Sequence, residues 1–414
     1  MQSVMFCTLL SNIVPVFYTK YANLLLKYHD QSELEYTLKN VTEKHPSITH
    51  LYPIGYSVQG VPLWVLSIGV SPRIHQVGIP EVKYIANIHG NEPVGRELLL
   101  YFIEYLVGNY KHNKDIQALI NSTRIHFLPA LNPDGFKRSV PGDCRGDTGR
   151  TNFNDVDLNR NFPYIFSHNV SPLQSETLAA MQWFQSETFV LSATLHGGAL
   201  VAVYPLSFNT KGLTGEAKAP DDEVFRYLAR TYANTHKTMH KGNVCSDTFA
   251  GGITNAAEWY PILGCLQDYN YIMGQCLELT LEVSCCKYPT EDQLPRLWEE
   301  NKLALLELTK QVHKGIKGRV LNSAGDGIPK AILHIGVQNR RYIYQANSYG
   351  EFYKILMPGK YMVQITAHGY LPSTRLVTVN DNIGSYSADI YDFSLQREEA
   401  ETTGHEASMC VSCS

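Results

Sequence analysis

Apolar, strand-like runs alternate with helical periods along most of the chain. Between about Tyr36 and Gln311, strand-like runs such as VPLWVLSIGV, VKYIANIHG and RIHFLPALNPDG flank helical segments such as GRELLLYFIEYLVGNY. Pro93, followed by Leu98 and Phe102 at helical spacing, predicts that a helix begins just after the second of these runs. Strands that alternate with helices predict an α/β fold with helices on both faces of a sheet.

The pattern changes after residue 313. Short alternating runs separated by Gly and Pro turns, from GRVLNSAGDGIPKAILHIGV to STRLVTVN, predict a small all-β sandwich over residues 314–396. The α/β domain before it is expected to cover residues 26–313. Residues 1–25 form an uncertain N-terminal segment that matches a signal peptide only marginally. The polar residues 397–414 are expected to form a disordered tail.

Charge and hydropathy exclude some classes of partner. The 414 residues carry a formal net charge of −4 and contain no block of Lys or Arg, so we expect no nucleic-acid partner. The chain has no apolar stretch of about 18 residues, which predicts that no helix spans a membrane. The C-terminal residues lack the hydrophobic stretch of a lipid-anchor signal, so no lipid anchor is expected.

Cysteines and glycosylation sequons give information on the cellular compartment of the protein. The chain has nine Cys, and sequons occur at Asn40, Asn121 and Asn169. Each sequon is weak evidence alone because the motif is short. Together with the Cys they favour an oxidising, secretory environment and predict an extracellular, secreted protein.

Two of the strand-like runs end in histidine. The run VKYIANIHG leads to His89, with Glu92 where the helix begins, and the run VLSATLHGG leads to His196. Sites in α/β sheets gather outside the carboxyl ends of strands, which is where both His fall. Two His and one Glu match the open ligand set of catalytic zinc, whereas structural zinc normally uses Cys. The sequence therefore predicts one Zn²⁺ held by these three side chains.

Further polar residues occur where a reaction would need them. The run CLELTLEVSCC places Glu278 and Glu282 on the same face of a strand, and alternation alone does not decide which one enters the site. Burying an unpaired carboxylate is costly, and a base beside a metal is one reason to keep it. The segment GRTNFNDVDLNRNFP adds Arg150, Asn159 and Arg160, and a guanidinium beside an amide is suited to gripping a terminal carboxylate.

These motifs form an ordered set that resembles the zinc metallocarboxypeptidases of the carboxypeptidase N/E group. The matching pieces are HGNEPVGRELLL, NPDGF, DLNRNFP, HGGALVA, WYP, QDYNY and SCCKYP, in order over about residues 28–395. The resemblance implies a mixed-sheet zinc carboxypeptidase domain followed by a transthyretin-like β-sandwich. It also implies a zinc exopeptidase whose partners are the C-termini of peptides or proteins.

The resemblance assigns roles by position. It makes His89, Glu92 and His196 the zinc ligands, Glu282 the general base and acid, and Arg150 the group that stabilises the oxyanion. For substrate binding it implicates Asn159 and Arg160 on the C-terminal carboxylate, Tyr260 as a mobile side chain over the bound residue, and Gln267 in the specificity pocket. It implies disulfides that pair Cys144 with Cys286 and Cys245 with Cys285. Cys276 is expected to be a small buried side chain, and Cys7, Cys265, Cys410 and Cys413 have no expected partner.

One departure from the pattern concerns specificity. Relatives of this group prefer C-terminal Lys or Arg and place an Asp in the pocket, but the stretch HGGALVAVYPLSFN has Ser207 there. A hydroxyl provides no counter-charge, so we expect basic residues to be released with a relaxed preference. The alternative is that a neighbouring carboxylate, Asp268 or Asp221, compensates.

Two other functions compete with this interpretation. A peptide-binding relative without catalytic activity is disfavoured because the catalytic positions are all present. A zinc deacylase of N-acyl amino acids would not be expected to carry the DLNRNFP segment together with a β-sandwich.

Overall fold

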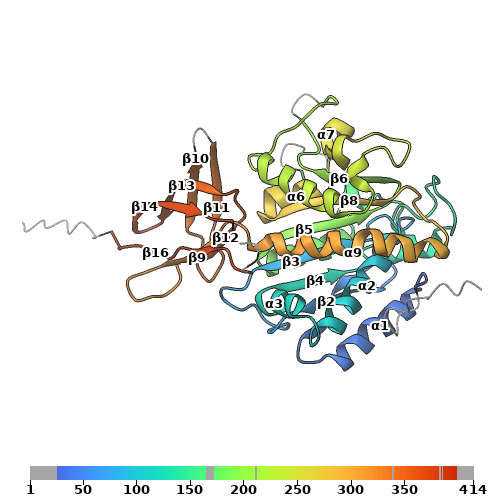
Figure 1. Cartoon of the computed structure of the whole chain (residues 1–414), viewed down its shortest axis with the longest axis horizontal. Coiled ribbons are helices and arrows are strands. Elements are labelled where there is room, and N and C mark those ends of the chain that lie inside the picture. The colour runs from blue at the N-terminus through green and yellow to red at the C-terminus, as the bar shows by residue number, and fades with distance from the viewer. Residues whose placement is uncertain are drawn as a thin grey trace, which may run out of the picture.

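The computed structural model contains a large mixed sheet followed by a smaller all-β module (Figure 1). It describes residues 26–398 except 165–171, 210–211, 338–339, 382–383 and 385. The large sheet has eight strands in the order β1-β2-β4-β3-β5-β8-β6-β7. Its central strands β4, β3, β5 and β8 are parallel, whereas β1 and β2 pair antiparallel with each other and β2 pairs antiparallel with β4. Strand β6 is antiparallel to β8 and parallel to β7. The predicted α/β fold with a mixed sheet is confirmed.

The elements of the large domain follow one another in an alternating order. The strands are β1 (Thr49–Tyr56), β2 (Pro62–Ile68), β3 (Glu81–Ala86), β4 (Arg124–Leu128), β5 (Phe189–His196), β6 (Ala199–Tyr204), β7 (Ile253–Asn255) and β8 (Leu277–Ser284). The helices are α1 (Gln31–Lys44), α2 (Val94–Asn109), α3 (Lys114–Ser122), α4 (Pro133–Arg138), α5 (Ser175–Ser186), α6 (Asp222–Thr235), α7 (Ala256–Trp259), α8 (Leu266–Gly274) and α9 (Leu294–Lys310).

Helices cover both faces of the large sheet, and each face has its own core. On one face, apolar side chains of α1, α2, α3, α6 and α9 pack against the sheet. On the other face, α5 and α8 pack against it with a smaller cluster that includes Trp183, Leu266 and Cys276. The central strands are buried along their whole length, as expected for parallel strands covered on both sides. The site residues at their ends are therefore held by a rigid support.

Helix α2 begins where the sequence predicts it. Pro93 is its N-cap residue, and nearly every residue from Val94 to Phe102 is buried. Gly95 lies where the first turn crosses β5, and a Cβ there would lie 2.6 Å from the Cβ of Leu195. Any larger side chain would push the helix away from the sheet. This close approach brings the start of α2 next to the end of β5.

The smaller module consists of one antiparallel sheet and one mixed sheet around a separate apolar core. One sheet has the order β11-β10-β13-β14, and the other pairs β12, β9 and the short strands β15 and β16. Their bounds are β9 (Ile316–Leu321), β10 (Ile332–Val337), β11 (Arg340–Gln345), β12 (Glu351–Lys354), β13 (Gly359–Ala367), β14 (Tyr370–Val379), β15 (Asp389–Ile390) and β16 (Phe393–Ser394). In β9 the pairing with β15 and β16 is parallel. This arrangement agrees with the predicted all-β C-terminal fold.

The module attaches where the parallel strands of the large sheet begin. The amide of Asn347 donates to Thr188 Oγ1 at 3.1 Å, just before β5, and Gln275 Oε1 accepts from the backbone of Gln345 at 2.7 Å, just before β8. Lys354 forms an ion pair of 2.8 Å with Asp221, the residue immediately before α6. All these contacts lie at the amino ends of β5 and β8 or near them. The carboxyl ends of the strands stay clear of the module.

Several expectations concern cysteines and chain ends. Both implied disulfides form, Cys144–Cys286 and Cys245–Cys285. Cys265 and Cys276 are buried thiols. Asn121 is exposed and Asn40 is partly buried, whereas Asn169, Cys7, Cys410, Cys413, the possible signal peptide and nearly all of the expected tail lie outside the described residues.

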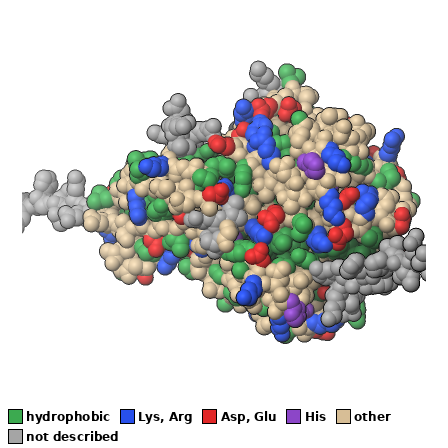
Figure 2. Space-filling model, viewed as in Figure 1, with side chains coloured by type: hydrophobic (Ala, Val, Ile, Leu, Met, Phe, Trp, Pro, Cys, Tyr) green, Lys and Arg blue, Asp and Glu red, His purple; other side chains and the backbone are tan. Residues whose placement is uncertain are grey.

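The surface mixes charges of both signs. On the face seen in Figure 2, basic and acidic side chains are interspersed over both parts of the molecule. No helix in the described part of the chain combines the length and the apolar character needed to cross a membrane.

A buried histidine bridge joins the two parts of the chain. His75 Nδ1 lies 2.7 Å from Glu81 of β3, and its Nε2 lies 2.6 Å from Glu351 of β12. Burial disfavours the imidazolium, but the hydrogen bonds to Glu351 and Glu81 outweigh this effect and raise the pKa of His75 to about 9. Below its ordinary pKa of 6.5 the bridge contributes fully to stability, and this contribution is lost as the pH rises through 9.

We therefore expect the stability of the protein to fall between pH 7 and pH 10 partly because His75 loses its proton. In His75→Gln, which does not titrate, this fall should be smaller by about 1–2 kcal/mol. Urea unfolding at the two pH values measures the difference. His112→Gln, a substitution of an exposed histidine, serves as the control. An identical loss in wild type and His75→Gln would contradict the role of the bridge.

Candidate active site

Three polar side chains meet at the carboxyl ends of β3 and β5. His89 and Glu92 lie in the short connection from β3 to α2, and His196 is the last residue of β5. Asn87, at a left-handed φ of 59°, turns the chain away from β3 and donates its side-chain amide to the carbonyls of His89 and Gly90. The neighbouring parallel pairing of β3 and β5 brings the two connections together.

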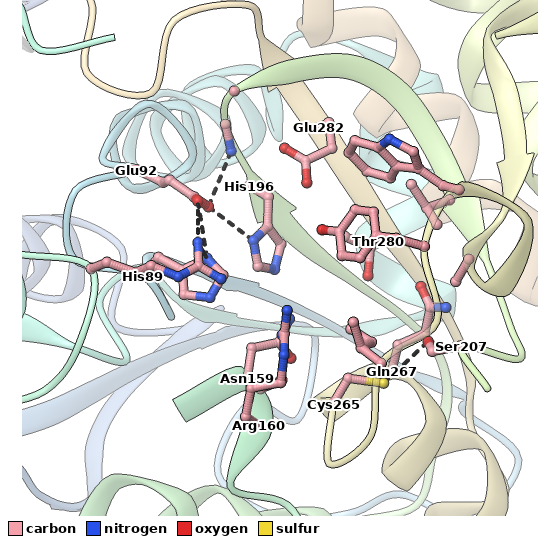
Figure 3. Close-up of a pocket in the computed structure, with 18 of the residues that line it drawn as sticks. His89, Glu92, Asn159, Arg160, His196, Ser207, Cys265, Gln267, Thr280 and Glu282 are labelled. Carbon is pink, nitrogen blue, oxygen red and sulfur yellow. Dashed lines mark hydrogen bonds and ion pairs between the residues drawn. The ribbon is translucent and has the colours of Figure 1, made fainter. Parts of the chain in front are cut away.

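The three side chains form a compact set of possible ligands. His89, Glu92 and His196 are 3–4% exposed, and a ligand atom from each lies within 4.8 Å of the others. Glu92 lies between the two rings, with Oε1 3.0 Å from His89 Nδ1 and Oε2 2.9 Å from His196 Nδ1 (Figure 3). Two imidazoles and one carboxylate, buried and convergent, fit the ligand set of catalytic zinc. Within the described residues, this is the one cluster of metal-binding side chains.

Asp157 supports this cluster and was not identified from the sequence. Its Oδ1 lies 3.1 Å from His89 Nε2, and its Oδ2 accepts from Arg150 Nε and Nη2 at 3.1 and 2.9 Å. Burial opposes ionisation of Asp157, but the hydrogen bond and charge of His89 and the charge of Arg150 lower its pKa. A carboxylate behind a ligating histidine fixes the ring and leaves the other nitrogen for the metal. The signal in the sequence that could have identified Asp157 is its position two residues before Asn159, in the segment NDVDLNR.

The structure separates the two glutamates of β8. Glu282 pairs in register with His196 on β5, lines the pocket, and has its Oε2 buried without a hydrogen-bond partner. Burial, followed by repulsion from Glu92, raises the pKa of its carboxyl. Glu278 accepts hydrogen bonds of 2.6 Å from Thr194 and Asn270 and does not line the pocket. Of the two, Glu282 is the carboxylate beside the cluster.

The candidate substrate-binding residues line the same cavity, whose volume is about 260 Å³. Asn159 Oδ1 accepts from the backbone of Leu266 at 3.0 Å, which fixes its amide, and Arg160 donates to the carbonyl of Asn159 at 2.9 Å. Tyr260 follows α7 and is 43% exposed at the cavity. Burial, followed by the charge of Glu282, raises the pKa of its phenol to about 12, so it is neutral at physiological pH. Arg150 and Lys287 also line the cavity.

The inner end of the cavity is lined mainly by neutral side chains. It is lined by Ser207, Cys265, Gln267 and Thr280 together with apolar side chains such as Val203 and Ile262 (Figure 3). Asp268 lies behind Ser207, and its carboxylate accepts from the Ser207 backbone N–H at 2.9 and 3.0 Å and from its hydroxyl at 3.1 Å.

Of the two carboxylates considered as compensating groups, only one is near the cavity. Asp268 contacts Ser207 directly, as described above. Asp221 is bound instead by Lys354 and by the hydroxyl of Tyr271 at 2.9 Å, at the attachment of the smaller module.

The disulfides tie the loops around the cavity to the end of β8. Cys286 joins the loop that precedes Arg150 through Cys144, and Cys285 joins the segment after α6 through Cys245. Two adjacent cysteines thus hold two separate segments of the chain to the strand that carries Glu282.

Fold, disulfides and the His-Glu-His cluster together define a zinc carboxypeptidase. Residues 34–304 match the family described as Zinc carboxypeptidase, and the chain belongs to that family. It is a zinc-dependent metallocarboxypeptidase, an exopeptidase acting at C-termini, with a zinc site at His89, Glu92 and His196.

Comparison with known proteins places the chain near particular members. It is 48% identical to carboxypeptidase M of Mus musculus over 381 residues, covering 90% of this chain and 86% of that protein. It is 40% identical to the carboxypeptidase N catalytic chain of Mus musculus, covering 91% of this chain and 87% of that protein. Among solved structures, thrombin activatable fibrinolysis inhibitor shares the fold, with a TM-score of 0.58, 19% identity and coverage of 69% of this chain and 75% of that chain.

The zinc site leads to a prediction of metal content. Purified protein should contain about one zinc per chain, and His196→Ala should lose most of it because two ligands hold the ion far less tightly than three. Metal analysis after dialysis measures the ratio. His112→Ala, at an exposed histidine, should keep its zinc. Full zinc retention in His196→Ala would rule out this ligand assignment.

Proposed function

We propose that the protein removes single residues from the C-termini of peptides and proteins, and that Lys and Arg are released with a relaxed preference over neutral residues. One observation carries this proposal. A single cavity is lined by the zinc ligands, by the unpartnered carboxylate of Glu282, and by the Asn159 and Arg160 pair. A general base, a metal site and a pair of side chains that can bind a carboxylate thus line the same cavity.

Glu282 is the proposed general base and acid. Zinc supplies Lewis acidity that activates a water molecule and polarises the peptide carbonyl. Glu282 takes a proton from the water and returns it to the departing amine, so the carboxylate is regenerated at the end of the cycle. Its buried, unpartnered Oε2 supports this role, because an acceptor of that kind is available to a bound reactant.

Arg150 is the proposed group that stabilises the negative charge on the carbonyl oxygen. Its guanidinium lines the cavity and is held by two hydrogen bonds to Asp157, so it need not reorganise when charge develops. Asn159 and Arg160 are proposed to bind the C-terminal carboxylate of the substrate. Their requirement for a free carboxylate restricts cleavage to the last peptide bond.

Two other features complete the proposal. Tyr260, exposed beside the cavity, is proposed to close over the bound residue. The two disulfides and the likeness to carboxypeptidases M and N support an extracellular location.

The competing functions are less well supported. A peptide-binding relative without activity would not need a buried base without a partner beside an intact zinc site. A deacylase of N-acyl amino acids would not be expected to combine the DLNRNFP segment with a C-terminal β-sandwich. We therefore retain peptide hydrolysis as the proposed function.

The role of Glu282 is tested by Glu282→Gln. The amide keeps the shape of the side chain but cannot accept the proton, so kcat should fall by roughly 10² to 10⁴ fold while peptide binding persists. Stopped-flow turnover and calorimetric binding of the same peptide separate the two effects. Glu258→Gln, at an exposed glutamate of α7, is the control. Near-normal turnover in Glu282→Gln would refute the assignment.

The relaxed preference is tested at Ser207. Ser207→Asp restores a carboxylate in the pocket, and a charge-assisted partner for a basic side chain is worth roughly 1.5 to 3 kcal/mol. The ratio of kcat/KM for matched peptides ending in Arg and Leu should rise by about 10 to 150 fold. Ser207→Asn, which has the same size without the charge, should give no such rise. A wild-type preference for Arg above about a hundredfold, unchanged in Ser207→Asp, would defeat this explanation.

A further inference from the structure

A buried carboxylate lies one layer behind the inner end of the cavity. Asp268 is 1% exposed, belongs to α8, and contacts the cavity wall through Ser207, whose N–H and hydroxyl both donate to it. The thiol of Cys265 also interacts with it. Within the described part of the chain, the hydrogen-bond partners of this carboxylate, Ser207 and Cys265, are neutral groups. A buried negative charge without a cationic partner is costly, and a bound cation would lower that cost.

The hydrogen-bond directions leave acceptors facing the cavity. The Ser207 hydroxyl donates its single hydrogen to Asp268, and the Cys265 thiol donates to Ser207 Oγ at 3.2 Å. The oxygen of Ser207 can therefore only accept a further hydrogen bond. Gln267, which is 4% exposed and lines the same end, has its Oε1 buried without any partner. The oxygen atoms of Ser207 and Gln267 can therefore each accept a hydrogen bond from a bound group.

We propose that Asp268 is a specificity-determining residue that supplies the counter-charge for a basic C-terminal side chain, acting through the hydroxyl of Ser207. The ammonium of Lys or the guanidinium of Arg would donate to Ser207 Oγ and Gln267 Oε1. The Ser207 hydroxyl, polarised by the carboxylate behind it, is a better acceptor than an isolated serine. This inference rests on the proposed function, since it assigns the inner end of the cavity to the side chain of the released residue. Because the carboxylate acts through a neutral hydroxyl and does not contact the ligand, it sustains a weaker preference for Lys and Arg than a contacting carboxylate would, as the relaxed preference requires.

The protonation state of Asp268 gives the inference a second observable consequence. Burial raises the pKa of Asp268 to about 6, although the hydrogen bonds from Ser207 oppose this shift. The titratable groups that face it are the Cys265 thiol, whose pKa burial raises to about 12, and the Tyr164 phenol, whose pKa is also raised by burial. Both are neutral near pH 6. Of these groups, only Asp268 therefore changes its charge between about pH 5 and pH 7.5.

The test measures binding of the free products, so it does not depend on turnover. The affinities of zinc-loaded protein for L-arginine and L-leucine are compared by calorimetry, in wild type and in Asp268→Asn. The attraction acts over roughly 5–6 Å at an effective dielectric constant of about 20, so the arginine-to-leucine affinity ratio should fall by about tenfold or more in the variant. Ser207→Ala, which removes the intervening hydroxyl but keeps the carboxylate, should give a smaller fall.

Asp221→Asn is the matched control, because it neutralises the other neighbouring carboxylate, which binds Lys354 instead of facing the cavity. The ratio should be the same in this variant as in wild type. In wild type alone, the ratio should rise several-fold from pH 5 to pH 7.5 as Asp268 ionises. This second measurement decides the question even if Asp268→Asn does not fold.

The outcomes separate this inference from the proposed function. An unchanged affinity ratio in Asp268→Asn, or equal losses for both amino acids, would overturn the role of Asp268. A wild-type ratio that does not vary between pH 5 and pH 7.5 would do the same. Absence of peptide turnover with the arginine preference in binding intact would instead refute the proposed function and leave the counter-charge in place.

Discussion

The site depends on holding a carboxylate between two imidazoles in a space that is almost closed to water. Glu92 can occupy that place only because β3 and β5 are adjacent and parallel, so that the connections after them meet at one edge of the sheet. Gly95 allows the helix that follows Glu92 to approach β5 closely. If any of these three conditions failed, the ligand atoms would separate and the buried carboxylate would lose its partners, at a cost of several kcal/mol.

The polar groups of the cavity are arranged in two layers. The inner layer, with His89, Arg150 and Ser207, faces the cavity, and the outer layer, with Asp157 and Asp268, lies behind it. In both places an acidic group accepts hydrogen bonds from the residue in front of it; Asp268 is buried, and Asp157 is partly exposed. The carboxylates therefore influence the cavity by orienting and polarising the inner groups, without offering ligand atoms at its surface.

The sequence predicted the sheet, the helix after Glu92 and the zinc ligands, because strand alternation, helical spacing and ligand chemistry are local properties. Strand alternation could not choose between Glu278 and Glu282, since a period of two fixes the face of a strand and says nothing about depth along it; the choice of Glu282 came from the family resemblance. Only the pairing with β5 places one of them beside His196. The sequence did not identify Asp157 and Asp268 as supporting groups, because each contacts a site residue far away in the sequence. Asp157 contacts His89, and Asp268 contacts Ser207. Asp268 appeared only as one of two alternatives, and contact with Ser207 distinguishes it from Asp221.

The attachment of the smaller module has a consequence for what can reach the cavity. Its contacts, including the bridge from His75 to Glu351, lie at the amino ends of strands whose carboxyl ends carry the zinc ligands. Strand β8, with eight residues, spans roughly 25 Å between those two edges. None of the described residues of the β-sandwich lines the cavity, so this module stands away from the entrance. A chain end projecting from a large folded protein meets the same opening as a short free peptide, and steric selection between them falls to the loops that surround the cavity.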